Sequence, residues 1–158
     1  MASRAETPHA PLPSNAESPL PHGETLIRRF EDTTLPIEQW WHETHLRVAF
    51  HYLTFHDLDG AIDHMRAGIQ RYNAAHDVPE AIDRGYHETI TQAWLRLLHA
   101  IMKSHGPFED AGALFALHPY LRHSKLLRLF YTRDRILSEK AKHTWVEPDV
   151  CAIGSYPR

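Results

Sequence analysis

Two histidines three residues apart are the first candidates for chemistry. In a helix, the side chains of His42 and His45 lie one turn apart on nearly the same face. Apolar residues such as Val48 and Leu53 fall on that face as well, whereas His51 falls on the polar side. A buried imidazole that finds no partner loses its hydration, which is unfavourable. The spacing therefore predicts that His42 and His45 have a polar partner inside the fold.

His87 is a third histidine on a face that should be buried. If a helix covers residues 86–102, Ile90 and Trp94 lie within about 80° of His87 around the helix axis. A metal ion would satisfy all three imidazoles, with zinc at roughly 2.0–2.1 Å from each nitrogen. Bundle cores hold metals in this way, with ligands from facing helices. We therefore predict a single metal ion bound by His42, His45 and His87.

Glu88 and Tyr52 are the side chains we expect to act beside the metal. Glu88 follows His87 directly and lies at the border of the same face, where it could be a fourth ligand, orient a ligand or serve as a general base. The alternative for Glu88 is a solvated carboxylate in the first turn, stabilised by the helix dipole. The alternative for the histidines is a hydrogen bond to a backbone carbonyl or to Tyr52, Thr91 or Glu88.

The predicted site suggests a mononuclear metalloenzyme that acts on a small molecule. Imidazole and carboxylate ligands suit iron, copper, manganese or zinc. We favour iron or copper and the oxidation of a small molecule by oxygen, because Trp and Tyr residues around the histidines predict a dry, largely apolar pocket. Zinc, which would activate water for hydrolysis or hydration, is the alternative. The zinc-protease helix signature is absent, because only one residue separates Glu43 from His45 where that signature has two. A non-catalytic helical module that binds a metal, a ligand or a partner remains the alternative.

Composition narrows the remaining classes of function. The chain has 158 residues, 42% of them hydrophobic, and its 14 histidines are scattered. The formal net charge of −3 and the lack of a basic patch argue against nucleic-acid binding. No apolar run reaches the roughly 20 residues of a membrane span, and no signal peptide is evident, so we expect a cytoplasmic protein. Cys151 is the only cysteine. A homodimer is left open.

The elements that must position these residues are all predicted to be helices. Residues 1–24 are rich in proline and poor in large apolar residues, which predicts a disordered lead-in before a helical domain over 25–158. No segment alternates apolar and polar residues for long enough to form a strand. We expect an all-α bundle of about five helices, near residues 36–55, 60–74, 86–102, 108–117 and 125–131, with a last turn opened by Ser138.

Two segments resemble a known family. The run from Trp41 to Leu46, followed by Ala49, Tyr52 and Leu53, resembles the W-x-H-x-x-H-L opening of a family of small uncharacterised bacterial helical proteins. Residues 85–91 resemble that family's G-Y-H-E-T-[IL]-T segment. The tail at residues 145–149 resembles its closing motif. The resemblance covers most of residues 28–153 and does not include the proline-rich lead-in. It implies that His42, His45, His87 and Glu88 matter as a set, but it implies no reaction, because the family has no established activity.

Overall fold

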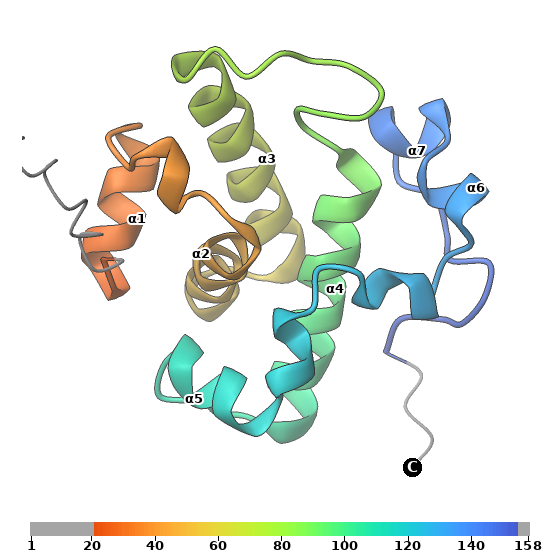
Figure 1. The fold of residues 1–158 in the computed structure, drawn as a ribbon. Helices are drawn as coiled ribbons and strands as arrows, with labels where there is room; N and C mark the ends of the chain where they lie inside the picture. Colours follow the sequence, from red (N-terminus) through yellow and green to blue (C-terminus); the bar gives the residue numbers. More distant parts are fainter. Residues whose placement is uncertain (1–20, 155–158) are drawn as a thin grey trace, which may run out of the picture.

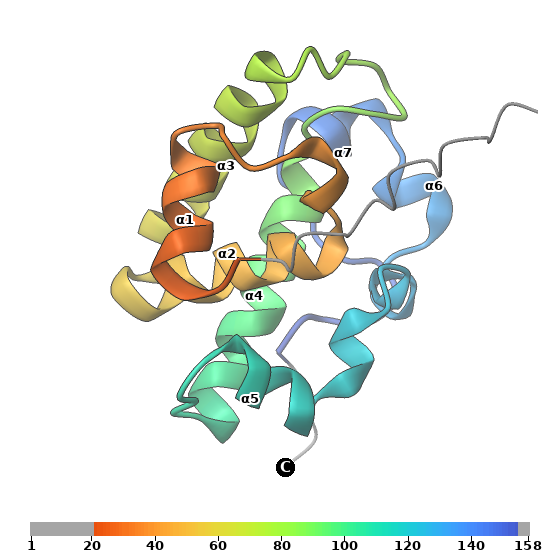
Figure 2. The ribbon, with the colours of Figure 1, turned by 60° about the vertical axis from the view of Figure 1, so that its left-hand side comes forward.

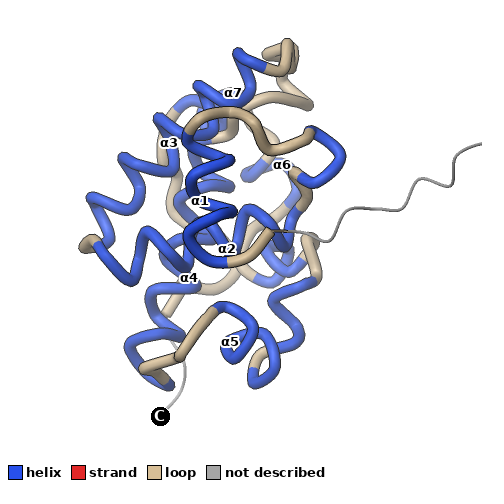
Figure 3. The backbone as a smooth tube through the Cα atoms, turned by 90° about the vertical axis from the view of Figure 1, so that its left-hand side faces the viewer, coloured by secondary structure: helices blue, strands red, loops and turns tan. Residues whose placement is uncertain are grey.

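Three helices form the centre of the molecule in the computed structural model, which describes residues 21–154. They are α2 (His42–Phe55), α3 (Leu58–Ala75) and α4 (Glu88–His105), and each contacts the other two extensively. Figure 1 shows α2 nearly end-on while α3 and α4 run along the page, so α2 crosses them steeply. The described residues contain helices and loops but no strand, apart from one isolated bridge (Figure 3). The predicted all-α bundle is confirmed.

Shorter helices surround this centre on three sides (Figure 2). α1 packs against α2 and α3, α5 packs against α2, and α7 packs against α4. Their bounds are Gly23–Glu31 for α1, Ala111–Leu117 for α5, Arg133–Ile136 for α6 and Glu139–His143 for α7, with 3-10 turns at Ile37–Gln39, Pro119–Arg122 and Leu126–Leu129. Within residues 21–154, no helix combines the length and the apolar character needed to cross a bilayer.

Polar side chains fix where several helices begin. Asp57, Asp110 and Ser138 each accept a hydrogen bond from the backbone N–H three residues later, which satisfies one of the unpaired donors of a first turn. Ser138 opens the last helix as predicted. Asp59 lies in the first turn of α3, two residues after its cap Asp57.

The N-terminal part of the domain differs from the prediction. The expected helix over 36–55 is divided into the 3-10 turn and α2, because the backbone is extended at Trp41. This break lets Trp40 turn inward and stack on Phe30, with 4.7 Å between ring centroids, while Trp41 stays exposed. Helix α1 was not predicted, and it includes the last two residues of the expected lead-in. Residues 1–20 of that lead-in lie outside the described residues.

Gly68 sets how closely α1 can approach α3. A Cβ atom at this position would lie 2.6 Å from Cε1 of the Phe30 ring. Alanine gains about 1 kcal/mol of helix propensity over glycine, but overpacking a core costs about 1–3 kcal/mol. We therefore expect Gly68→Ala to lower the free energy of unfolding by about 1 kcal/mol, as measured by urea denaturation. Adding Phe30→Leu should reduce the penalty of Gly68→Ala. A stabilised Gly68→Ala variant would contradict this packing.

Candidate functional site

The first turn of α2 places His42 and His45. His45 lies against Trp40, with 3.7 Å between the two ring centroids. Trp40 in turn packs between Phe30 and Tyr72, so the aromatic core orients the imidazole. The ring of His42 lies 4.6 Å from that of Trp94 on α4. Both histidines therefore lie toward the junction of the three central helices, as their spacing predicted.

His45 is a neutral imidazole with one unprotonated nitrogen. Its Nδ1 lies 2.7 Å from the carbonyl oxygen of Trp41, and a carbonyl can only accept, so Nδ1 carries the proton. Burial lowers the pKa of His45 from 6.5 to about 4, although the bond to Trp41 opposes this shift. The Nε2 atom is therefore a free acceptor at neutral pH, because no side chain or backbone group in residues 21–154 bonds to it.

His42 is held in the same way with its ring nitrogens exchanged. Its Nε2 donates to the carbonyl oxygen of Leu121 over 2.9 Å, which leaves Nδ1 unprotonated in the neutral ring. Burial lowers the pKa of His42, and the bond to Leu121 only partly offsets it. The structure thus brings two neutral imidazoles together, each with one free acceptor nitrogen.

Both imidazoles line one cavity of about 240 Å³ between α2, α3 and α4. Its walls are mainly apolar, and two hydroxyl groups, those of Thr91 and Ser124, supplement the histidines. The remaining lining residues are Leu46, Ala49, Met65, Ile69, Ile90, Trp94 and Leu95. Ser124 and the α3 residues were not singled out from the sequence, because their contribution depends on contacts between distant segments.

His87 does not join His42 and His45. It is the N-cap of α4 and not a residue inside the helix, so the helical angle assumed for it does not apply. Its Nδ1 accepts the N–H of Ile90 over 3.2 Å, and its Nε2 donates to the carbonyl oxygen of Ile136 over 3.0 Å. Both ring nitrogens are thus used. Across residues 21–154, no group of three or more His, Cys, Asp or Glu side chains is arranged to hold a metal ion.

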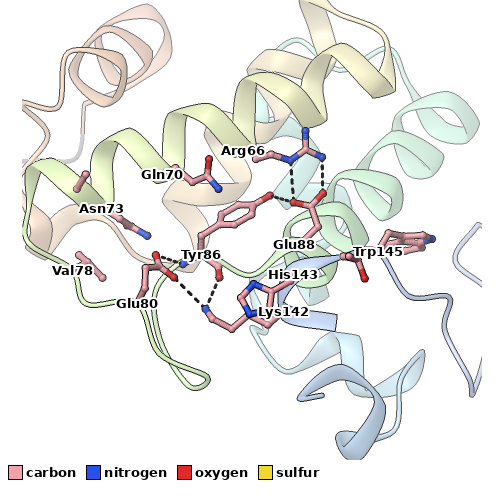
Figure 4. Close-up of a pocket in the computed structure, with 12 residues that line it drawn as sticks. Arg66, Gln70, Asn73, Val78, Glu80, Tyr86, Glu88, Lys142, His143 and Trp145 are labelled. Carbon is pink, nitrogen blue, oxygen red and sulfur yellow. Dashed lines mark hydrogen bonds and ion pairs between the residues drawn. The ribbon is translucent and has the colours of Figure 1, made fainter. Parts of the chain in front are cut away.

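Glu88 is buried and accepts four hydrogen bonds, of which those from Arg66 and Tyr86 are drawn in Figure 4. Arg66 donates to both carboxylate oxygens, over 2.6 and 3.0 Å. Tyr86 and Gln92 donate the other two bonds, over 2.7 and 2.6 Å. Burial alone would raise the pKa of Glu88, but these bonds outweigh it and lower the pKa to about 2. The carboxylate is therefore an ionised structural anchor at neutral pH and is poorly suited to act as a base.

Glu88 is linked to the histidine cavity only through intermediate side chains. Burial and the bond to Glu88 raise the pKa of Tyr86, while a hydrogen bond with the Thr91 side chain acts in the opposite direction. Thr91 also lines the cavity, so it connects the cavity with Glu88 and its partners Arg66, Tyr86 and Gln92.

Tyr52, the other predicted catalytic residue, lies apart from both groups. Its hydroxyl donates to Oε1 of Glu31 over 3.0 Å, and its ring packs on His64, so it joins α1, α2 and α3. Burial raises its pKa, which disfavours the phenolate form. The structure therefore assigns Tyr52 a packing and hydrogen-bonding contact outside the cavity.

The low pKa of His45 makes stability depend on pH. In the unfolded chain this imidazole takes up a proton below about pH 6.5, whereas in the folded protein it does so only near pH 4. The stabilisation from burying the neutral ring is thus present above pH 6.5 and is lost as the pH falls toward 4. We expect His45→Gln to remove about 1–2 kcal/mol of the acid destabilisation between about pH 7.5 and 5.

Urea unfolding at several pH values measures this effect, and His123→Gln, at an exposed position, is the matched control. A His45→Gln variant that loses stability with acid as steeply as the parent would show that the ring titrates normally.

Comparison with known proteins assigns neither a family nor a function to the chain. No family model matches the chain, and neither a curated protein nor a solved structure matches it. The function therefore has to be argued from the geometry of the described residues.

Proposed function

We propose that this protein binds a small molecule with an apolar body and at least one hydrogen-bond donor in the His42–His45 cavity. The observation that carries this proposal is that two histidines, each with one free ring nitrogen, line an otherwise mainly apolar cavity. Ligand sites commonly combine apolar walls with a few polar groups that fix orientation.

The size of the cavity limits the ligand. A cavity of about 150 Å³ in another protein holds benzene, and this one has about 240 Å³. A single ring with one or two small substituents therefore fits. Apolar contacts with Met65, Ile69 and Trp94 would supply most of the affinity, because they remove the ring from water.

The imidazoles determine which substituent is favoured. Both rings are neutral at pH 7 and present acceptors, so they favour a hydroxyl or N–H group over a carbonyl. Thr91 and Ser124 can donate or accept. A phenol or a similar ring alcohol donates to one of the free nitrogens, whereas a hydrocarbon leaves both unpaired.

A transition-metal site is the second candidate, and the same two nitrogens support it. Unprotonated imidazole is a good ligand for iron, copper, manganese or zinc. His42 and His45 would be the protein ligands, and water or a substrate would take the other positions. In that case the cavity would support oxidation of a small molecule, or hydrolysis with zinc. His87 and Glu88 would not be ligands, because their polar atoms already have partners.

The primary proposal is tested with p-cresol and toluene, which differ chiefly by one hydroxyl group. We expect p-cresol to bind at least about ten-fold more tightly than toluene, because the hydroxyl pairs with a free imidazole nitrogen. His45→Phe should weaken this preference, because only the free nitrogen of His42 then remains, whereas His51→Phe, outside the cavity, should leave it unchanged. Isothermal titration calorimetry gives the affinities. Binding of neither compound, or equal binding of both by the parent, would overturn the proposal.

The metal candidate makes a separate prediction. If His42 and His45 hold a metal, the parent should bind about one Zn²⁺ or Cu²⁺ per chain, and His42→Gln or His45→Gln should lose it. His87→Gln should still bind the metal, because both ring nitrogens of His87 are already bonded to backbone groups at the start of α4. Elemental analysis of tag-free protein measures the stoichiometry. A parent that binds no metal, or a metal lost only in His87→Gln, would exclude this pair as ligands.

A further inference from the structure

A second and larger recess is lined by Glu88 together with its partners Arg66 and Tyr86 (Figure 4). This cleft, of about 810 Å³, is formed by α3, the segment 76–87 and α7, and it shares no lining residue with the histidine cavity. Its lining consists of Arg66, Gln70, Asn73, Ala74, Val78, Glu80, Tyr86, Glu88, Lys142, His143, Thr144 and Trp145.

The main charges in this cleft already have partners. Arg66 is paired with Glu88 and with Asp63. Lys142, only 5% exposed, donates to the carbonyl oxygens of Arg84 and Tyr86 over 2.8 and 2.6 Å and lies 3.4 Å from Glu80. The two cations and the two carboxylates that line the cleft balance each other. A charged ligand would have to break one of these pairs in order to gain a counter-ion.

Two carboxamides in the same cleft are not used within the fold. Asn73 is only 7% exposed, yet its side-chain amide has no hydrogen-bond partner anywhere in residues 21–154. Gln70 lies one turn earlier on α3, and its amide is likewise unpaired within that range. Figure 4 shows both side chains projecting from α3 toward the space beside Tyr86. The Asn73 amide, which pairs with no group in that range, is open to the cleft that it lines and is therefore free to bond to a ligand there.

We propose that this cleft binds an uncharged molecule of about the size of a sugar, carrying hydroxyl and amide groups. Each carboxamide offers both donors and an acceptor, which matches hydroxyls and amides. The paired charges give the cleft no net preference for an anion or a cation. Ala74, Val78 and the Tyr86 ring supply apolar surface against which the carbon skeleton of such a molecule can pack.

The test uses N-acetylglucosamine as the neutral probe, with glucosamine and glucuronate as its cationic and anionic counterparts. The chain has only two Asn and three Gln residues, so its side-chain amide signals are readily assigned by NMR. We expect N-acetylglucosamine to shift the Asn73 and Gln70 signals at concentrations at least about ten-fold lower than either charged sugar.

Three variants assign the effect to the cleft. Asn73→Leu keeps the number and branching of the side-chain heavy atoms but removes the amide, and it should abolish binding of the probe. Gln70→Leu, at an exposed position that leaves the fold intact, should weaken it several-fold. Ala67→Gln adds an amide to the exposed surface of α3 outside the cleft and should bind like the parent. Absence of the shifts in the parent, equal shifts with a charged sugar, or unchanged binding by Asn73→Leu and Gln70→Leu would each overturn the proposal.

Discussion

The buried carboxylate of Glu88 is the constraint around which the two recesses are arranged. It lies at the first residue of α4, where the helix dipole favours a negative charge. Arg66 brings α3 to it, and Tyr86 brings the end of the segment 76–87. An isolated charge at this depth would be strongly unfavourable, and removing one partner of a buried pair typically costs about 3–5 kcal/mol. The packing of α3 against α4 therefore depends on keeping this pair intact, and both recesses depend on that packing.

The aromatic core positions the histidines, as the Arg66–Glu88 pair positions α3 against α4. Phe30, Trp40 and Tyr72 come from three separate segments and meet beside His45. Their packing deprives the imidazole of water and so keeps it neutral. Because the ring donates to the carbonyl oxygen of Trp41, its free nitrogen has a fixed identity and direction. A site of this kind is prepared before a ligand arrives, which reduces the entropy lost on binding.

Periodicity predicted the pairing of His42 with His45 and the all-helical class, because both depend on residues close together in the chain. It failed for His87, since the helical angle assumed there requires a helix beginning at Tyr86, and α4 begins at Glu88. Arg66 lies 22 residues before Glu88 and carries no local sign that the two will pair. The roles of Asn73 and Lys142 depend in the same way on contacts between distant segments, which a single sequence does not specify.

The position of Lys142 late in the chain determines when the cleft can form during synthesis. Its ammonium group closes the segment 76–87 by binding two of that segment's carbonyl oxygens, so the cleft is complete only when this lysine is in place. During synthesis on the ribosome, α3 and the segment itself emerge long before residue 142. A nascent chain can therefore form the helical wall of the cleft but cannot close it. The cleft can therefore be occupied only after the chain has been synthesised beyond residue 142 and this lysine has bound the segment.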